Sequence, residues 1–384
     1  MKNSVKHAPT RDILSLFFAT RLLLVLVTYA GYILLTQEKY SSAPVSVSTL
    51  LNTWNQWDAT IYIRLAQYGY HAAADMAFFP LFPLLIRLFA FPFGAEGYLI
   101  AGMLLSNLAL LGVLFVLYEL AVESGGEQVA RRTLLYLCIF PTAFFFFAAY
   151  NEALFLLFTT GAFLALRSRR WWLAGLLGLL ATLTRSAGVL LVVPYLYELW
   201  TNRERMSTNW WTLASGLLPV ILIPLGMGLY CIYCWYITGN PLAFATVQAH
   251  WSRHLAWPWH GIWQNLFELF WNQPFGSFNQ VHVLLDLVAT LGFIVLLVLG
   301  RKKLRVSYSL WTALLLLYIL LSPSIDQHDA LISNQRFVLE MFPAFITLAL
   351  LSVQHARVQQ TLVWVFPALL ATLSLLFVMG KWMV

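Results

Sequence analysis

The first polar stretch with residue types suited to catalysis follows the first long apolar run. It reads Trp54-Asn55-Gln56-Trp57-Asp58-Ala59-Thr60-Ile61-Tyr62. The carboxylate of Asp58 is suited to act as general base for an acceptor hydroxyl, and the neighbouring indole of Trp57 is suited to stack on a sugar ring. The same pattern fits an aspartate that caps a helix N-terminus and is followed by an interfacial aromatic belt. The residues alone leave both interpretations open.

Two arginines lie where a positive charge needs a partner. Arg185 occupies the tip of a short predicted hairpin, and an unpaired charge within a membrane is costly. Its candidate partners are Glu152, in a structural ion pair, and an anionic ligand such as a phosphate, which suits the donor fork of arginine. Arg336 lies in 324–337, the most polar of the predicted outer stretches, and is a second candidate for holding a phosphate.

Residues of metal-binding or redox type occur in three places without a defined pattern. One group has no ligand spacing of a known metal site: Asp326, His328 and Asp329. Another group is interleaved with tryptophans, as in an interfacial belt, a sugar site or a metal site: His250, His254 and His260. Cys231 and Cys234 have redox spacing but lie in an apolar run, which favours packing. We therefore expect no metal and no cofactor.

The composition indicates a chain that lies in lipid. Of its 384 residues, 60% are hydrophobic and 10% are charged, whereas soluble domains have about 25% charged residues. Several continuous apolar runs approach the roughly 20 residues of a membrane helix, and no alternating pattern of a β-barrel occurs. The net charge of +7 comes from basic residues in short connections, so it does not indicate a nucleic-acid partner.

The basic residues also predict the orientation of the helices. Residues 13–35 form an apolar run that is too long for a signal peptide and has basic residues before it, so we expect an uncleaved first helix with a cytoplasmic N-terminus. The cytoplasmic clusters would then hold 15 of the 23 Lys and Arg residues, at the N-terminus and near 131, 167–170, 203–205, 301–305 and 357. The outer connections would be 37–97, 150–152, near 185, 238–280 and 323–336.

This pattern predicts an all-α polytopic membrane protein in which residues 1–384 form one transmembrane domain of about eleven crossings. The first outer loop, 37–97, carries Asp58, and the outer loop 238–280 is rich in tryptophan. We expect both loops to contain interfacial helices. Between Arg132 and Arg167 the chain must cross twice within 34 residues, and the next hairpin is equally short. Polar hairpin tips below the membrane surface must line a cavity or be buried in protein, so we expect a recessed, outward-opening pocket.

Taken together, these motifs resemble the PIG-V-like mannosyltransferases, relatives of the second mannosyltransferase of glycosylphosphatidylinositol assembly, in the GT-C class. The matching pieces occur in order from about residue 50 to 345: Trp57-Asp58-Ala59, Gly69-Tyr70, the Ala77–Pro83 run, the Phe140–Leu154 run, Thr184-Arg185-Ser186 and Gln335-Arg336-Phe337. One position departs from the pattern, because Ile61 occupies the place where WDAxH-type relatives have histidine.

The resemblance implies an inverting transfer of mannose, or another hexose, from a polyprenyl-phosphate sugar to a hydroxyl of a lipid, glycan or protein acceptor. Asp58 would be the general base, and arginines would stabilise the leaving phosphate. The expected substrate-binding residues are Trp57, Arg64, His71, Glu152, Arg185, Gln335 and Arg336. No cofactor other than the lipid-linked donor is implied, and no nucleotide-binding motif occurs.

Two other classes of function compete with this interpretation. A transporter or lipid flippase should show inverted halves and broken helices at the membrane midplane, but the unusual polar residues of this chain gather at the predicted outer ends. A non-catalytic membrane scaffold has only the scarcity of acidic residues in its favour. We expect a multi-pass protein of the plasma membrane with its active site on the outer face and membrane lipids around it.

Overall fold

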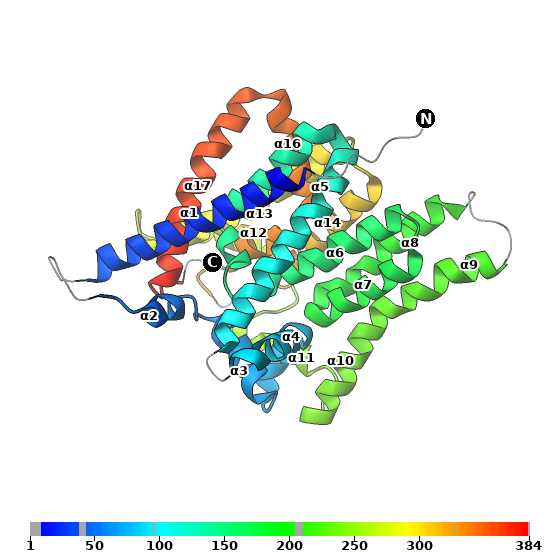
Figure 1. Cartoon of the computed structure of the whole chain (residues 1–384), viewed down its shortest axis with the longest axis horizontal. Coiled ribbons are helices and arrows are strands. Elements are labelled where there is room, and N and C mark those ends of the chain that lie inside the picture. The colour runs from blue at the N-terminus through cyan, green and yellow to red at the C-terminus, as the bar shows by residue number, and fades with distance from the viewer. Residues whose placement is uncertain (1–8, 38–43, 95–96, 204–209, 326, 383–384) are drawn as a thin grey trace.

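The computed structural model is built of helices, as Figure 1 shows. It describes residues 9–37, 44–94, 97–203, 210–325 and 327–382. Within these ranges the backbone forms no β-strand, and a single isolated antiparallel bridge joins Arg253 to Ser324. The predicted all-α class is therefore confirmed.

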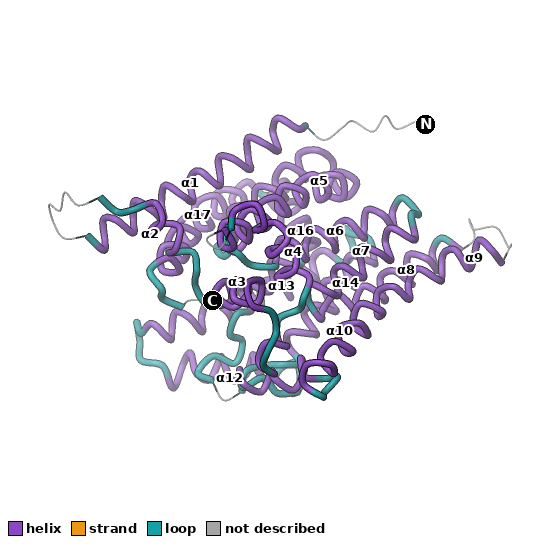
Figure 2. Tube along the Cα trace, turned by 60° about the horizontal axis from the view of Figure 1, so that its bottom comes forward, coloured by secondary structure: helices purple, strands orange, loops and turns teal. Residues whose placement is uncertain are grey.

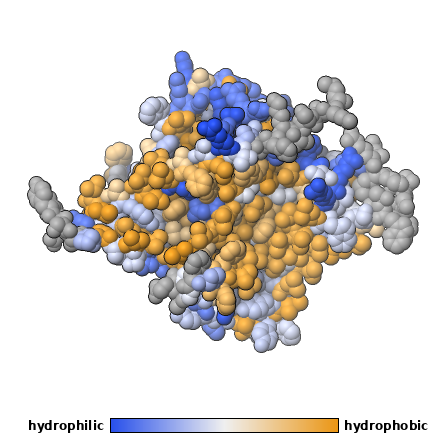
Figure 3. All heavy atoms as spheres, viewed as in Figure 1, coloured by the Kyte–Doolittle hydropathy of each residue, from blue (hydrophilic) through white to orange (hydrophobic). Residues whose placement is uncertain are grey.

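Five helical stretches within the described ranges are long and apolar enough to cross a membrane. They are α1 (Thr10–Thr36), α5 (Gly97–Ile139), the stretch Ala214–Thr238 that ends with α10 (Leu222–Thr238), α13 (Phe278–Gly300) and α17 (Ala356–Val378). On the face shown in Figure 3, hydrophobic residues form a broad area across the middle of the molecule, with hydrophilic residues mainly above it. The chain is a multi-pass membrane protein.

A sixth candidate span is bent by 85°. It joins Asn334–Glu340, which holds α15 (Asn334–Phe337) and the 3₁₀ turn η9 (Val338–Glu340), to α16 (Phe342–Gln354). Five or six spans are fewer than the eleven that we expect from the sequence, and several other apolar helices are short. The exact number of crossings therefore stays a prediction.

The two undersized hairpins are present. The helices concerned are α6 (Glu152–Arg167), α7 (Trp171–Thr184) and α8 (Val192–Thr201), with the 3₁₀ turn η4 (Ser186–Leu191) between the last two. Helix α6 has 16 residues and α7 has 14, which agrees with the predicted short legs. Helix α7 packs between α6 and α10.

Glycine is required at the bend within α5. At Gly126 the backbone has φ 83° and ψ 179°, so the helix breaks into two at this residue. A residue with a side chain rarely adopts this conformation, because its Cβ meets the neighbouring backbone. The break lies between two predicted crossings and next to the basic pair at 131–132, where the sequence predicts a cytoplasmic turn.

The two predicted outer loops are folded into short helices. Residues 44–94 contain α2 (Val47–Asn52), α3 (Asp58–Tyr68), η1 (Ala73–Ala77), α4 (Leu81–Ala90) and η2 (Phe91–Phe93). Residues 238–280 contain α11 (Ala243–Thr246), η7 (Val247–Trp251), α12 (His260–Phe267) and a short π-helical turn, η8 (Glu268–Asn272). Figure 2 shows many of the loops gathered around α3, α12 and the C-terminal end. The remaining elements are η3 (Ala143–Phe146), α9 (Trp210–Leu217), η6 (Leu218–Ile221) and α14 (Val306–Leu320).

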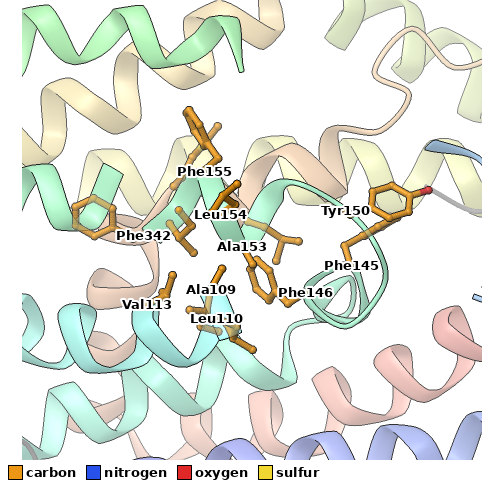
Figure 4. Packing of buried hydrophobic residues seen from close by; sticks show 14 of the residues in the cluster. Ala109, Leu110, Val113, Phe145, Phe146, Tyr150, Ala153, Leu154, Phe155 and Phe342 are labelled. Carbon is orange, nitrogen blue, oxygen red and sulfur yellow. The ribbon is translucent and has the colours of Figure 1, made fainter. Parts of the chain in front are cut away.

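The core that supports these loops lies between α5, α6 and α16 (Figure 4). Fully buried side chains there include Leu110, Phe146, Ala153 and Phe342. Because helix association in a membrane depends on close van der Waals contact, small residues are common at such contacts. A Cβ on Gly102 of α5 would lie 2.8 Å from that of Ala149, so the segment before α6 packs directly on α5.

At the C-terminal end of α6, away from Glu152, basic and acidic side chains of different helices pair with one another. Arg167 contacts Glu123, which also contacts Arg305 at 2.9 Å, and Arg131 contacts Asp12 at 2.7 Å. These basic residues belong to the clusters that we expect on the cytoplasmic side.

Candidate active site

A cavity of about 840 Å³ lies where the five predicted outer connections meet. Each connection contributes to its wall: Asp58, Glu152, Arg185, Arg253 and Arg336 all line it. The structure thus places a cavity at the two hairpin tips, as the short legs predict. Glu340 is its remaining acidic lining residue, and His250 also lines it.

Asp58 and Arg336 form an ion pair at the cavity, although they are 278 positions apart in the sequence. Arg336 donates from Nη1 to Asp58 Oδ2 at 2.7 Å. The Arg336 side chain is 9% exposed and that of Asp58 is 26% exposed, so the carboxylate is the more accessible partner. The pair therefore presents a partly accessible carboxylate on the cavity wall.

The backbone has a positive φ just before each of the helices that carry the two partners. Trp57, directly before Asp58, has φ 51°, and Ser333, directly before α15, has φ 71°. Non-glycine residues with a positive φ cost of order 1–3 kcal/mol, and such residues cluster at functional sites. The two residues directly precede α3, which begins with Asp58, and α15, which carries Arg336.

A second set of ion pairs lies beside the first. Arg185 contacts Glu152 Oε1 at 3.1 Å and also contacts Glu340. Arg336 Nε lies 3.5 Å from the same Glu152 oxygen, so Asp58, Arg336, Glu152, Arg185 and Glu340 form one continuous charged network. The Arg185–Glu152 pair that the sequence suggested is therefore present, and it does not stand alone.

Arg253, which sequence reasoning missed, is the third arginine of the cavity. It donates to the backbone oxygens of Ser322 and Ile332, and no carboxylate of the described residues lies within 4.0 Å of it. The ring of Phe337 lies 5.0 to 5.2 Å from the guanidinium carbons of Arg185, Arg253 and Arg336. Cation–π attraction thus gathers three cations around one ring.

Charges on the cavity wall balance. Three carboxylates and three guanidinium groups line it, and one member of each set was not predicted from the sequence: Glu340 and Arg253 carry no motif of their own. The only sequence feature that could have found them is their location: Arg253 lies in the predicted outer connection 238–280, and Glu340 lies just after the connection 323–336.

Trp57 contributes an aromatic wall. Its ring lies 5.3 Å from that of Trp382, and both residues line the cavity. Arg336 lies 6.0 Å from the Trp382 ring. Trp57, next to Asp58 in the sequence, and Trp382, near the C-terminus, therefore both lie beside the Asp58–Arg336 pair.

The structure does not bring Arg64 and His71 to the cavity wall. Arg64 pairs with Asp75 at 2.5 Å, and the backbone N–H groups of His71 and Ala72 donate to the same carboxylate. Burial alone would raise the pKa of Asp75, but these three hydrogen bonds lower it below its ordinary value. Arg64 and His71 thus hold the loop that follows α3.

Gln335 is held through its backbone, and its side chain is not part of the cavity wall. Its N–H donates to Asp286 Oδ1 at 2.8 Å, and its carbonyl accepts from Thr142 at 2.7 Å. Gln335 therefore fixes α15, which carries Arg336. A direct contact of Gln335 with substrate stays a prediction.

The loosely metal-like residues of the last connection are not brought together as a set. Asp326 lies outside the described residues, His328 is exposed, and Asp329 is buried against His282 of α13. Of the three histidines in the tryptophan-rich segment, only His250 lines the cavity.

Comparison with solved structures defines the class. The fold is similar to that of ArnT from Cupriavidus metallidurans, solved bound to undecaprenyl phosphate, with a TM-score of 0.53 and 14% sequence identity over 92% of this chain and 62% of that one. The polytopic helical fold is therefore that of the GT-C glycosyltransferases.

The sequence model of the Mannosyltransferase (PIG-V) family matches residues 5–378, and the chain belongs to that family. The mouse GPI alpha-1,6-mannosyltransferase 2 is 36% identical over 163 residues, which are 38% of this chain and 32% of the mouse protein. The GPI mannosyltransferase 2 of Schizosaccharomyces pombe is 24% identical over 220 residues, 52% of this chain and 47% of that protein. The matches thus span about a third to a half of these relatives.

Proposed function

We propose that this chain transfers a mannosyl unit from a polyprenyl-phosphate mannose to a hydroxyl of a glycan, lipid or protein acceptor, with inversion at the anomeric carbon. The observation that carries the proposal is the ion pair between Asp58 and Arg336 on the wall of the cavity. Membership of the mannosyltransferase family supports the sugar, and the charged network supports a phosphate-linked donor.

In the proposed reaction Asp58 takes the proton of the acceptor hydroxyl. The acceptor oxygen forms a bond to the anomeric carbon while the bond from that carbon to the phosphate oxygen breaks, and the lipid phosphate leaves with the electron pair. The carboxylate is suited to this role because one oxygen is fixed by Arg336 and the side chain is still accessible.

The leaving phosphate gains negative charge as the bond breaks, so preorganised cations favour the transition state. Arg185, Arg253 and Arg336 surround Phe337 on the cavity wall. Arg185 and Arg336 are held by carboxylates, whereas Arg253 is held by backbone oxygens among the described residues. We assign the first phosphate contact to Arg253, with Arg185 and Arg336 behind it.

Trp57 and Trp382 form the aromatic side of the cavity and are suited to stack on a sugar face. We place the cavity on the non-cytoplasmic side, because the ion-paired basic clusters lie away from it and follow the positive-inside pattern. A plasma membrane, with the N-terminus in the cytoplasm, is the location that we propose.

The proposal is tested with the purified full chain in lipid nanodiscs. Radiolabelled mannose is offered as polyprenyl-phosphate mannose or as a nucleotide sugar, together with a panel of glycan, glycolipid and peptide acceptors. We expect transfer from the lipid donor alone, and an NMR spectrum of the product that shows inversion. Transfer from the nucleotide sugar alone, or a product with retained configuration, would contradict the proposal.

A further inference from the structure

Three buried side chains converge behind the last outer connection, outside the cavity wall. His282 and Asp286 lie one helical turn apart on α13, and Asp329 comes from the connection that leads to α15. Each offers a ligand atom, and these atoms all lie within 4.8 Å of one another. His282 is 7% exposed, Asp286 is fully buried, and Asp329 is 5% exposed.

The two carboxylates are arranged alike. Asp286 Oδ1 accepts from the backbone N–H of Gln335, and Asp329 Oδ1 accepts from Asn265 and from the backbone N–H of Leu331. The Oδ2 atom of each points toward His282 Nδ1, at 3.8 Å from Asp286 and 2.8 Å from Asp329. One oxygen of each carboxylate is therefore anchored to the protein, as in the outer shell of many metal sites.

The two Oδ2 atoms have no basic side chain of the described residues within 4.0 Å other than His282. No lysine or arginine of the described residues lies within 4.0 Å of either carboxylate, and Asp286 Oδ2 has no hydrogen-bond partner there. Two buried carboxylates beside one imidazole are costly unless a cation or a proton compensates them. A divalent ion would neutralise both at once.

We propose that His282, Asp286 and Asp329 bind a divalent transition-metal ion, of which Zn²⁺ is the best match. Imidazole nitrogens and carboxylate oxygens are both common zinc ligands, with bonds of about 2.0–2.2 Å to the ion. Two ligand atoms of a tetrahedral ion with such bonds lie roughly 3.4 Å from each other. The separations of 2.8 and 3.8 Å bracket this value, so small side-chain shifts complete the site. Mg²⁺ and Ca²⁺ prefer oxygen ligands alone.

The ion would serve as a structural clamp. It would tie α13 to the last outer connection at Asp329 and fix Asp286, whose other oxygen holds Gln335 next to Arg336. Since three ligands come from two segments 43 positions apart, binding would stabilise the folded connection. This inference does not depend on the proposed mannosyl transfer, and its tests use no activity measurement.

The first test is the metal content of the full chain, purified without chelators and supplied with Zn²⁺ before gel filtration. We expect about one zinc ion per wild-type chain, and a loss of most of it in H282A and D329N. The matched control is E198Q, which alters a buried carboxylate that accepts from Ser307 far from this cluster and should keep the zinc. Equal zinc in wild type and in folded H282A would overturn the site.

The second test keeps the wild-type sequence, so that it does not rely on the folding of a variant. After stripping with EDTA, Zn²⁺ should raise the midpoint of thermal unfolding by several degrees, and Mg²⁺ should not. Cobalt(II) should give the visible absorption of a tetrahedral N/O site. A stripped chain that neither gains stability with zinc nor shows the cobalt bands would overturn the proposal.

Discussion

At the scale of single residues, the central feature is the ion pair between Asp58 and Arg336. Asp58 is the candidate general base, and Arg336, which fixes its carboxylate, is also suited to hold the leaving phosphate. The 2.7 Å bond from Arg336 orients Asp58, and Glu152 lies 3.5 Å from Arg336 on its other side. In the proposed reaction, the carboxylates would hold Arg336 in place before a donor binds. Such preorganisation costs no rearrangement at the moment of reaction.

Arg253 gives the sharpest test of the phosphate assignment. We expect R253A to weaken donor binding about 10–100-fold, because a hydrogen bond to a charged group is worth about 1.5–3 kcal/mol. Binding of a fluorescent polyprenyl phosphate to the purified chain measures this loss. The control is R87A, which removes an exposed arginine of α4 that does not line the cavity. Equal affinity in R253A and R87A would remove Arg253 from the donor site.

Sequence reasoning reached part of this site. Asp58, Glu152, Arg185 and Arg336 were identifiable because each is a charged residue at an expected membrane boundary, where a charge needs a reason. Glu340 was missed, because its contact with Arg185 depends on the 85° bend between Asn334–Glu340 and Phe342–Gln354. The contacts that join the network, Arg336–Asp58, Arg336–Glu152 and Arg185–Glu340, connect residues at least 155 positions apart in sequence, so they depend on the tertiary fold.

At the scale of elements, the undersized hairpins explain how polar groups reach the cavity. Helices α6 (16 residues) and α7 (14 residues) are shorter than a full span of about 20 residues. Asn151, directly before α6, donates to the carbonyl of Thr184, the last residue of α7, at 3.0 Å. The turn η4 then packs back on α7. The two short hairpins could be predicted from the distances between basic clusters, whereas the packing of η4 on α7 could not.

Gly188 in η4 permits this close packing. A Cβ there would lie 2.4 Å from the backbone nitrogen of Thr182, and backbone cannot move aside cheaply. We expect G188A to lower stability by about 1–3 kcal/mol and to weaken donor binding through a shift of Arg185. The control is G292A in α13, where an added Cβ meets nothing within 4 Å. A thermal unfolding midpoint of G188A equal to that of G292A would contradict this role.

At the scale of the whole molecule, the sides predicted from the basic residues agree with which segments lie together in the structure. The five connections predicted to lie on one side meet at one cavity, and several basic clusters predicted for the other side pair with acids there. The number of crossings stays a prediction, because the apolar helices α4, α7 and α14 are too short to be counted as spans by length and composition.

Cysteine labelling tests the orientation. In a chain whose Cys138, Cys231 and Cys234 are replaced by serine or alanine, A73C lies in η1 near the cavity side and K302C lies in the turn after α13. We expect a membrane-impermeant maleimide to label A73C in intact cells, and K302C only after permeabilisation. The reverse pattern would place the cavity on the cytoplasmic side.

The most direct measurement of the central claim is mannosyl transfer by D58N compared with its donor binding. We expect transfer to fall at least about 100-fold, as for loss of a general base, while polyprenyl-phosphate affinity is kept or increases because Arg336 loses its partner. The control is D12N, which alters the partially exposed partner of Arg131 and should transfer normally. A folded D58N chain that transfers mannose at the rate of D12N would contradict the role of Asp58.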